Sequence, residues 1–454
     1  MKNVLNIMKL ALLPIATLVT SQAGAQEAEK LGRELTPVGA ERSGNTAGTI
    51  PDWKGGLCSA PATYKPKSAK QLLPYSDPFV DDKPLFTISA VNVAEYKDRL
   101  AIGTQELLRR YPDSFKVSVY PTRRSACMPT SVYENTKKRI NAAKLEGNGV
   151  GISGAYAQIP FPIPKSGQEV MWNFMLAYAP PNEETEISGY FTDSAGSRQL
   201  AFQNQQSFHR RYWAAMQPLK DDEPSLQFLT WNLKPVAQYG TAILGSSFLR
   251  LDLKDTEAWT YAPGQRRVRL APELRYDTVQ GPNLINFADE FLGFQGRMDK
   301  FDFKLVGKKE MIVPYNGYKL LQEDVEKVAM ARHVNPAVDR WELHRMWVVE
   351  ATLKPGQRHV QKKKVFYIDE DSWQMVVYDS FDQADKIHHH LVYPLVQEYD
   401  KTVPRAVTYQ IYDMSKGAWF LQLPVGDRRS GNQLVEKFPN SYFTPDAIVR
   451  NAAR

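Results

Sequence analysis

Residues 341–353 read Trp-Glu-Leu-His-Arg-Met-Trp-Val-Val-Glu-Ala-Thr-Leu, and apolar side chains recur there at nearly every second position. One set of alternate positions holds Trp341, Leu343, Trp347, Val349, Ala351 and Leu353. The other set holds Glu342, His344, Glu350 and Thr352 together with two apolar residues. Successive side chains of a β-strand point to opposite faces of its sheet. The stretch therefore predicts a half-buried antiparallel strand, with one face packed and the other toward solvent.

The same alternation recurs through residues 184–423. Examples are Trp259/Tyr261, Val268/Leu270, Phe301/Phe303/Leu305 and Ile387/Leu391/Tyr393. We count roughly ten such segments between turn signals, which favours a large antiparallel sheet or barrel over a parallel α/β fold. The 454-residue chain also contains 30 Pro and 27 Gly and is 11% aromatic, as expected for a protein with many strands and turns.

Helices are expected mainly before this region. Residues 92–111 carry apolar side chains at helical offsets and stop at a proline, and residues 131–145 predict a second helix. Ser166 and Glu169 form a capping box that begins a short apolar helix. Pro160, Pro162 and Pro164 precede that helix as a rigid extended strap.

These signals divide the chain into three parts. Residues 1–25 are expected to be a targeting segment. Residues 26–165 form a mixed helical region that ends in the proline strap, and residues 166–454 form a β-domain with a helix at its start and an irregular tail.

The first 25 residues have the three parts of a secretory signal peptide. Two lysines precede an apolar run over residues 10–19, which is shorter than the roughly 20 residues that a membrane-spanning helix needs. Ala23-Gly24-Ala25 is a small-x-small cleavage motif, so we expect cleavage between Ala25 and Gln26. No cysteine stands at the cut, so lipidation there is not expected. The mature chain is predicted to be soluble outside the cytoplasm.

Cys58 and Cys127 are the two cysteines of the chain. Two cysteines alone cannot supply a zinc ribbon or an iron–sulfur cage, which take about four ligands. After export they would meet an oxidising environment, in which a disulfide persists. Their spacing does not show whether the two Cα atoms approach each other, so the sequence leaves this disulfide open.

Several kinds of chemistry lack support in the sequence. The 57 Lys and Arg residues against 50 Asp and Glu give a modest net charge of +7, and basic doublets are scattered, so nucleic acid is not an expected partner. Gly149-Val-Gly151-Ile-Ser-Gly154 matches a dinucleotide-binding pattern, but a helix precedes it and the proline strap follows, so no cofactor is expected. No Gly-x-Ser-x-Gly nucleophile motif is present, and no catalytic residue is assigned.

His388, His389 and His390 are the most conspicuous candidates for metal ligands. In a regular strand, His389 would point with Ile387 and Leu391, while His388 and His390 would point to the opposite, solvent-facing side. Three consecutive residues then cannot close one site, and no metal site is predicted. Whether the apolar face of the sheet encloses a solid core or a ligand cavity is equally open, because inward apolar residues look identical in both.

A set of ordered motifs resembles a known family. The motifs are Leu35-Thr-Pro-Val-Gly-Ala-Glu41, Gly44-Asn45, Gly48-Thr-Ile-Pro-Asp-Trp53 with Gly55-Gly56, Tyr120-Pro-Thr-Arg-Arg124, Pro160-Phe-Pro-Ile-Pro164 with Lys165 and Gly167, and Glu169 with Trp172-Asn173. Together they resemble the domain-of-unknown-function family 1329, whose members are exported proteins of Gram-negative bacteria. Members are often labelled outer membrane lipoprotein-sorting proteins, because their β-region is similar to the periplasmic carriers LolA and LolB.

The resemblance implies a mainly β (α+β) fold, in which a large open antiparallel β-barrel is covered by helices from an N-terminal region. It also implies a cavity for acyl chains and a periplasmic location. Expected partners are a lipid or other hydrophobic molecule, an exporter of the resistance-nodulation-division superfamily and an outer-membrane protein. The resemblance supplies no catalytic residues, and this chain is much longer than the lipoprotein carriers.

We therefore predict a soluble periplasmic carrier or chaperone for a hydrophobic molecule. A docking subunit of an envelope transporter that holds no ligand, or a periplasmic hydrolase, are the alternatives. The predicted cavity wall consists of Trp172, Trp259, Tyr261, Phe301, Phe303, Trp341 and Trp347. Arg123 and Arg124 are candidates for a carboxylate or phosphate head group, because the guanidinium fork suits both. The alternative role for them is structural pairing with acidic residues of the protein.

Overall fold

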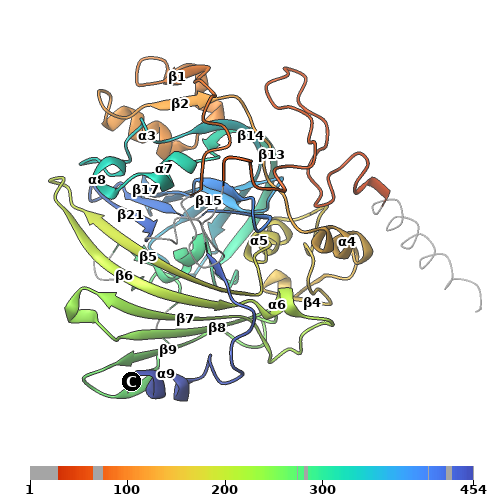
Figure 1. The fold of residues 1–454 in the computed structure, drawn as a ribbon, viewed down its shortest axis with the longest axis vertical. Coiled ribbons are helices and arrows are strands. Elements are labelled where there is room, and N and C mark those ends of the chain that lie inside the picture. The colour runs from red at the N-terminus through yellow and green to blue at the C-terminus, as the bar shows by residue number, and fades with distance from the viewer. Residues whose placement is uncertain are drawn as a thin grey trace, which may run out of the picture.

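The computed structural model describes residues 29–64, 75–272, 275–280, 285–406, 408–425 and 432–452, and its fold is mainly β (Figure 1). The predicted signal peptide, with its cleavage site between Ala25 and Gln26, lies outside the described residues. No helix in the described part of the chain is long and apolar enough to cross a membrane.

One 16-stranded sheet organises the molecule. Its main path runs through β10 (Arg267–Leu270), β9 (Glu257–Ala262), β8 (Ala242–Phe248), β7 (Pro224–Lys234), β6 (Arg198–His209), β5 (Asn182–Thr192), β21 (Ala418–Pro424), β20 (Tyr409–Asp413), β17 (Ile387–Val392), β16 (Met375–Phe381), β15 (Lys363–Asp369), β14 (Trp341–Leu353), β2 (Val117–Tyr120) and β1 (Phe86–Ile88). β13 (Phe301–Pro314) also pairs with β14, and β22 (Gln433–Leu434) with β5. The sheet is large and open, and the closure into a barrel is not seen among the described strands.

The pairing is antiparallel throughout this sheet except between β14 and β2, which run parallel. β1 and β2 precede residue 165 in the chain and nevertheless join the same sheet as the later strands. The strands of this sheet thus come from both sides of residue 165, and the division of the chain at that residue stays a prediction. The described residues also form three small two-stranded sheets: β3 (Lys144–Glu146) with β4 (Gly151–Ser153), β11 (Val279–Gln280) with β12 (Asn286–Phe287), and β18 (Leu395–Glu398) with β19 (Val403–Ala406).

Helices are short. They are α2 (Val93–Tyr96), α3 (Ile102–Arg110), α4 (Thr130–Lys138), α5 (Gly167–Met175), α6 (Arg211–Ala214), α7 (Tyr318–Gln322), α8 (Val325–Val328) and α9 (Pro445–Ala452), with 3₁₀ turns η1 (Lys97–Arg99), η2 (Gly147–Gly149), η3 (Val236–Gln238) and η4 (Ala288–Gly293). The helix predicted over residues 92–111 is broken at Leu100 and Ala101, which are extended and buried in two hydrophobic clusters. The helix predicted over residues 131–145 ends at Lys138.

The prediction for α5 is confirmed in detail. The Ser166 hydroxyl caps the helix by accepting a hydrogen bond from the Glu169 amide at 3.2 Å, and the Glu169 carboxylate accepts one from the Lys165 amide. The proline strap lies along this helix, because the Asn173 side-chain amide exchanges two hydrogen bonds with the backbone of Phe161, at 2.8 and 2.6 Å. The cap thus fixes the start of α5, and the strap is held to the helix at Phe161.

Two clusters of buried side chains cover opposite faces of the central strands. Phe420 of β21 belongs to the cluster that contains α5, whereas its neighbours Trp419 and Leu421 belong to the cluster that contains Leu107 of α3. The far faces of β7–β9 carry a further cluster that includes Leu244 and, from α9, Ile448. Figure 1 shows α9 against β9 and α3 beside β2 at the other end of the molecule.

The expectation that residues 341–353 are half-buried is wrong, although the bounds of β14 agree with the prediction. Polar as well as apolar side chains of β14 are buried. Glu342 is fully buried, and hydrogen bonds that Arg340 and Asn316 donate to its carboxylate, at 2.6 and 3.0 Å, offset the cost of burying its charge. Buried charges are tolerated when they are paired and hydrogen-bonded, so the polar face of β14 could be covered by other parts of the chain.

A β-bulge changes the direction of the histidines in β17. Asp379 of β16 pairs with His390, but Phe381 pairs with Ile387, so two residues, His388 and His389, face one residue of β16. A bulge of this kind interrupts the strict alternation of side chains. The imidazole rings of His388 and His389 consequently stack on each other with centroids 4.3 Å apart, and the predicted opposite directions of these two side chains are wrong.

The disulfide that the sequence left open is present between Cys58 and Cys127, whose Cα atoms lie 5.4 Å apart. Gly56 makes this approach possible. Its φ is +79°, and a Cβ atom there would lie 2.1 Å from the carbonyl oxygen of Ala126. The bond therefore ties a loop near the start of the described chain to the segment that follows β2.

Candidate functional site

The candidate site is a cavity of about 550 Å³ inside the curve of the sheet. The inner faces of β5–β8 form one wall, and α5 with residues 285–297 forms much of the cover. Strand alternation decides which side chains enter it: in β8, Ile243, Gly245 and Ser247 line the cavity, whereas Leu244 packs in the cluster with α9 on the far face.

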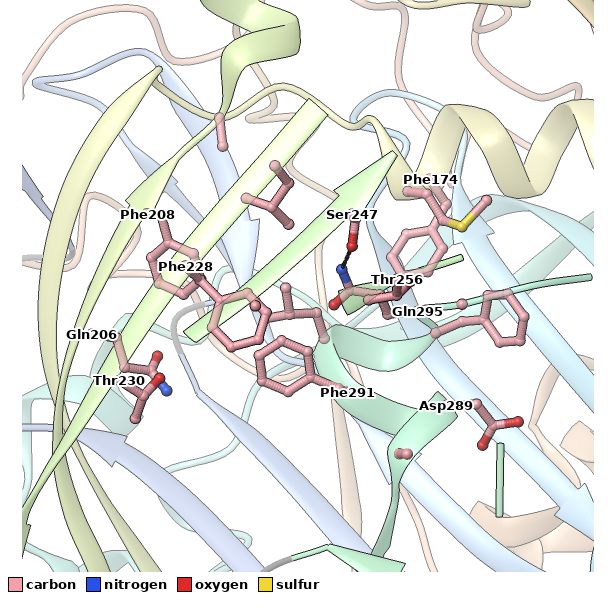
Figure 2. Close-up of a pocket in the computed structure, with 18 of the residues that line it drawn as sticks. Phe174, Gln206, Phe208, Phe228, Thr230, Ser247, Thr256, Asp289, Phe291 and Gln295 are labelled. Atoms are coloured by element: carbon pink, nitrogen blue, oxygen red, sulfur yellow. Dashed lines mark hydrogen bonds between the residues drawn. The ribbon is translucent and has the colours of Figure 1, made fainter. Parts of the chain in front are cut away.

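Phenylalanine side chains form the apolar part of the wall. Figure 2 shows Phe208, Phe228 and Phe291 gathered on one side of the cavity and Phe174 of α5 on another. The ring centroids of Phe208 and Phe228 lie 6.5 Å apart, and those of Phe228 and Phe291 lie 5.1 Å apart. Side chains thus enter from two strands and from η4, far apart in the sequence.

Glycine creates room for these rings. A Cβ atom on Gly245 would lie 2.2 Å from the ring of Phe228, its cross-strand partner. A Cβ atom on Gly189 would likewise lie 2.5 to 2.6 Å from the rings of Phe420 and Phe202, which also line the cavity. The rings can therefore lie flat across the neighbouring strand and leave space at the centre of the curve.

Neutral polar groups interrupt the apolar wall. The Gln295 amide donates a hydrogen bond to the Ser247 hydroxyl at 2.5 Å, as the dashed line in Figure 2 marks. The amide oxygen of Gln295 and the hydroxyl of Thr256 are buried and make no hydrogen bond with the described residues. Because a buried polar atom without a partner costs free energy, these two atoms are available to a polar group of a bound molecule.

Two arginines that line the cavity, Arg210 and Arg405, are paired with Glu183, which is not among the lining residues. Arg210 and Arg405 each donate a hydrogen bond of 2.7 Å to a different oxygen of the buried Glu183 carboxylate. Burial raises the pKa of Glu183, but the two guanidinium groups outweigh this effect and lower it overall. The carboxylate therefore stays ionised, and it partly neutralises the two cations at this wall.

Another ion pair lies at η4. Asp289 lines the cavity, and its carboxylate is paired with the Lys364 ammonium and hydrogen-bonded to His359 Nε2 at 3.1 Å. Burial raises the pKa of Asp289, while the charge of Lys364 and the contact with His359 lower it further than burial raises it. The cavity thus presents an apolar centre with ion-paired charges at its margins.

The structure brings one of the seven predicted aromatic residues to the cavity wall. Trp172 of α5 lines it and is held by a hydrogen bond from its indole nitrogen to the Gly149 carbonyl oxygen at 3.0 Å. Phe301 and Phe303 are buried in the neighbouring hydrophobic cluster without lining the cavity, and Trp347 packs at the edge of that cluster, where it stacks on Trp373.

The remaining three aromatic residues lie elsewhere and are not among the residues that line this cavity. Trp341 packs in the cluster that contains α3, and Trp259 and Tyr261 pack in the cluster that contains α9. The physical reason is that both faces of the sheet are covered. Apolar residues at alternate positions then show that one face of a strand is buried. They do not show whether that face encloses the cavity or packs in a cluster on the other side of the sheet.

Neither predicted arginine lines the cavity. The Arg123 guanidinium is partly exposed and pairs with Asp82 at 2.6 Å. The Arg124 guanidinium is buried and forms two hydrogen bonds with Asp371, at 2.8 and 2.7 Å. Both guanidinium forks are therefore occupied by carboxylates of the protein itself.

The wall contributed by β5–β8 was not predicted from the sequence. β6 is rich in glutamine, and its alternate residues Phe202, Gln206 and Phe208 line the cavity. Because this face of β6 mixes polar and apolar side chains, it does not show the apolar alternation that predicts a buried face. A phenylalanine opposite a glycine on the neighbouring strand, such as Phe228 opposite Gly245, is the sequence signal that could have indicated this wall.

The fold and the cavity define a class: a mainly β protein in which a large open antiparallel sheet curves around an apolar space. Residues 87–449 match the model of the family described as protein of unknown function (DUF1329), and the chain belongs to that family. The family resemblance found in the sequence is thereby confirmed.

One relative and two solved structures are similar to this chain. An uncharacterized protein of Pseudomonas aeruginosa is 35% identical over 451 residues, covering 98% of this chain and 97% of the relative. The crystal structure of a DUF1329 family protein from Desulfovibrio piger is 12% identical, covers 62% of this chain and 97% of its own, and has a TM-score of 0.44. A LolA superfamily protein from Nitrosomonas europaea is 11% identical, covers 62% of this chain and 99% of its own, and has a TM-score of 0.36.

Proposed function

We propose that the protein is a periplasmic carrier or chaperone that holds a lipid or another hydrophobic molecule in the cavity. The observation that carries the proposal is the apolar space of about 550 Å³ between β5–β8 and the cover. Small-molecule sites have volumes of roughly 300 to 1,000 Å³ and apolar walls with a few polar groups. A solid core would leave no such space, since protein interiors are packed to the density of organic crystals.

The wall supports binding of an apolar chain with a neutral polar group. Each methylene group that leaves water for such a cavity contributes about 0.8 kcal/mol. The unpaired oxygen atoms of Gln295 and Thr256 offer hydrogen bonds to a hydroxyl or amide of the same molecule. Glu183 partly neutralises the positive charges of Arg210 and Arg405, so these arginines attract an anionic ligand less strongly.

The location and the partners belong to the proposal as well. Export rests on the signal peptide pattern of residues 1–25, and work with an envelope exporter rests on the family resemblance. We propose binding and not catalysis as the activity.

A docking subunit without ligand should copurify with its transporter after crosslinking in cells, whereas a carrier should be captured transiently. A hydrolase should turn over esters or glycans in a substrate screen.

The direct test is to purify the protein from its own cell envelope, record native mass spectra and extract the bound molecules with organic solvent. We expect an apolar molecule bound one to one. Repeated preparations that contain no apolar molecule would count against a carrier.

Two neighbouring glutamines provide a matched pair of variants for the cavity. Gln206 of β6 lines it, whereas Gln205 lies on the opposite face of the same strand, and both are partly buried. Gln206→Trp should fill the space and weaken binding of a fluorescent fatty acid by about tenfold or more, because overpacking costs about 1–3 kcal/mol. Gln205→Trp should leave the affinity unchanged. Equal affinities of both variants and the parent would show that the probe binds elsewhere.

A further inference from the structure

The bulge in β17 brings together a group of side chains that the cavity does not use. One ligand atom each from His388, His389 and Asp413 lies within 4.8 Å of the others. Asp413 of β20 is the cross-strand partner of His389, so strand register holds these two residues on the same face. His389 and Asp413 are each 1% exposed, and His388 is partly exposed.

The hydrogen bonds of His389 leave one ring nitrogen for a ligand. Its Nδ1 contacts both oxygens of the Glu290 carboxylate, at 2.8 and 3.0 Å. Its Nε2 points toward Asp413, with Nε2 and Oδ2 separated by 3.9 Å. Histidines that bind metals almost always donate the other ring N–H to a carboxylate, carbonyl or water, which fixes the tautomer and the ring orientation. Glu290 fits this orienting role.

Buried polar atoms without hydrogen bonds point to a missing ligand. Nδ1 of His388 and Oδ2 of Asp413 are buried and make no hydrogen bond with the described residues. The other oxygen of Asp413, Oδ1, is held by the Ser415 amide and hydroxyl and by the Lys416 amide, at 2.6 to 3.0 Å. Asp413 is therefore fixed with its second oxygen toward the two imidazoles.

One cation of the protein is near this oxygen. Lys416 Nζ lies 3.2 Å from Asp413 Oδ2, but the Lys416 side chain is 63% exposed and can swing into solvent. The Lys416 ammonium therefore competes with a bound cation for this oxygen at the rim of the site.

We propose that His388, His389 and Asp413 form a binding site for a borderline divalent cation of the Zn²⁺ type, with Glu290 as a positioning residue. Two imidazole nitrogens and one carboxylate oxygen are a donor set that suits Zn²⁺. Bonds of about 2.0–2.2 Å in a tetrahedral site would draw the three ligand atoms closer together than they lie now. Three protein ligands leave a fourth position for water or a ligand atom. The site is independent of the cavity and of the carrier proposal.

The test uses the purified full chain, freed of metal by a chelator and titrated with Co²⁺, whose visible absorption reports coordination, and with competing Zn²⁺. We expect one saturable site with micromolar or tighter affinity. His388→Gln should weaken binding at least about tenfold, because it removes a direct metal ligand. Loss of a residue that only orients a ligand already lowers metal affinity by about 10–100-fold. Asp413→Asn should have a similar effect. No saturable binding by the parent chain would overturn the proposal.

His209 provides the matched control, because it is also partly buried and its Nδ1 contacts the Asn182 amide oxygen. His209→Gln should bind Co²⁺ like the parent, and loss of binding in this variant equal to that of His388→Gln would also overturn the proposal. Lys416→Gln should tighten binding, since it removes the ammonium that competes for Asp413 Oδ2. If Asp413→Asn does not fold, the partly exposed His388 variant, checked by circular dichroism, decides the outcome.

Discussion

Asp339 shows how burial at a single residue makes stability depend on pH. Its carboxylate accepts a hydrogen bond from the Trp341 indole at 2.7 Å and one from the Arg340 amide at 3.2 Å. Burial raises the pKa of Asp339 to about 6, and these hydrogen bonds offset only part of the increase. The folded protein therefore keeps a proton on Asp339 at pH values where the unfolded chain, with a pKa near 3.8, has lost it.

This difference in pKa predicts a specific pH profile. Between about pH 4 and pH 6 the folded state binds more protons than the unfolded state, so the contribution of Asp339 to the free energy of unfolding falls as the pH rises. A difference of about two pH units corresponds to about 3 kcal/mol. Asp339→Asn, which has no titrating carboxyl, should remove this decrease from urea-unfolding profiles measured from pH 4 to pH 7. The exposed Asp98→Asn is the control, and parallel profiles for parent and Asp339→Asn would contradict the prediction.

At the scale of elements, α5 links local sequence to the candidate site. Ser166 caps the helix, the strap is hydrogen-bonded to it, and Trp172 and Phe174 on the same helix line the cavity. The stability of this short helix therefore affects the cover of the cavity. Most helical stability in proteins comes from packing, and the cap supplies a smaller local contribution.

Ser166→Ala should lower the free energy of unfolding by about 1 kcal/mol, the usual cost of losing an N-cap side chain. Urea unfolding followed by circular dichroism measures the change. Ser131→Ala is a suitable control, because Ser131 is exposed near the start of α4, whose N-cap makes no side-chain hydrogen bond. A loss in Ser131→Ala as large as in Ser166→Ala would show that the effect is not capping.

β14 and β17 differ in how well the sequence predicts their structure. The bounds of β14 agree with the prediction because thirteen residues of alternation form a long local signal. β17 contains a bulge opposite Ser380, and nothing within residues 387–392 reveals it. A bulge depends on which residues of the neighbouring strand form hydrogen bonds, so the shared side of His388 and His389 could not be read from their spacing.

At the scale of the whole molecule, the Cys58–Cys127 disulfide connects segments separated by 69 residues. The bond lies outside the set of residues that line the cavity. In the chain-entropy model, a loop of this length gives about 4 kcal/mol of stabilisation through its effect on the unfolded chain. The disulfide should therefore affect global stability and leave ligand binding intact.

The double variant Cys58→Ala, Cys127→Ala should unfold at a lower temperature than the parent, with a loss of stability of about 4 kcal/mol. Its affinity for a fluorescent fatty acid should equal that of the parent. Adding a reductant should lower the melting temperature of the parent but not of the variant. A reductant effect of equal size on both proteins would mean that another property of the chain is responsible.

Local patterns in the chain were enough to predict the antiparallel sheet, the bounds of β14, the cap of α5 and the family. These features depend on residues close together in sequence, where alternation, capping and turn chemistry act directly. The cavity wall of β5–β8 and the grouping of His388, His389 and Asp413 were decided by the tertiary structure alone. The physical reason is that alternation reports burial without saying which covered face encloses the cavity, and strand register brings together residues that no local pattern connects.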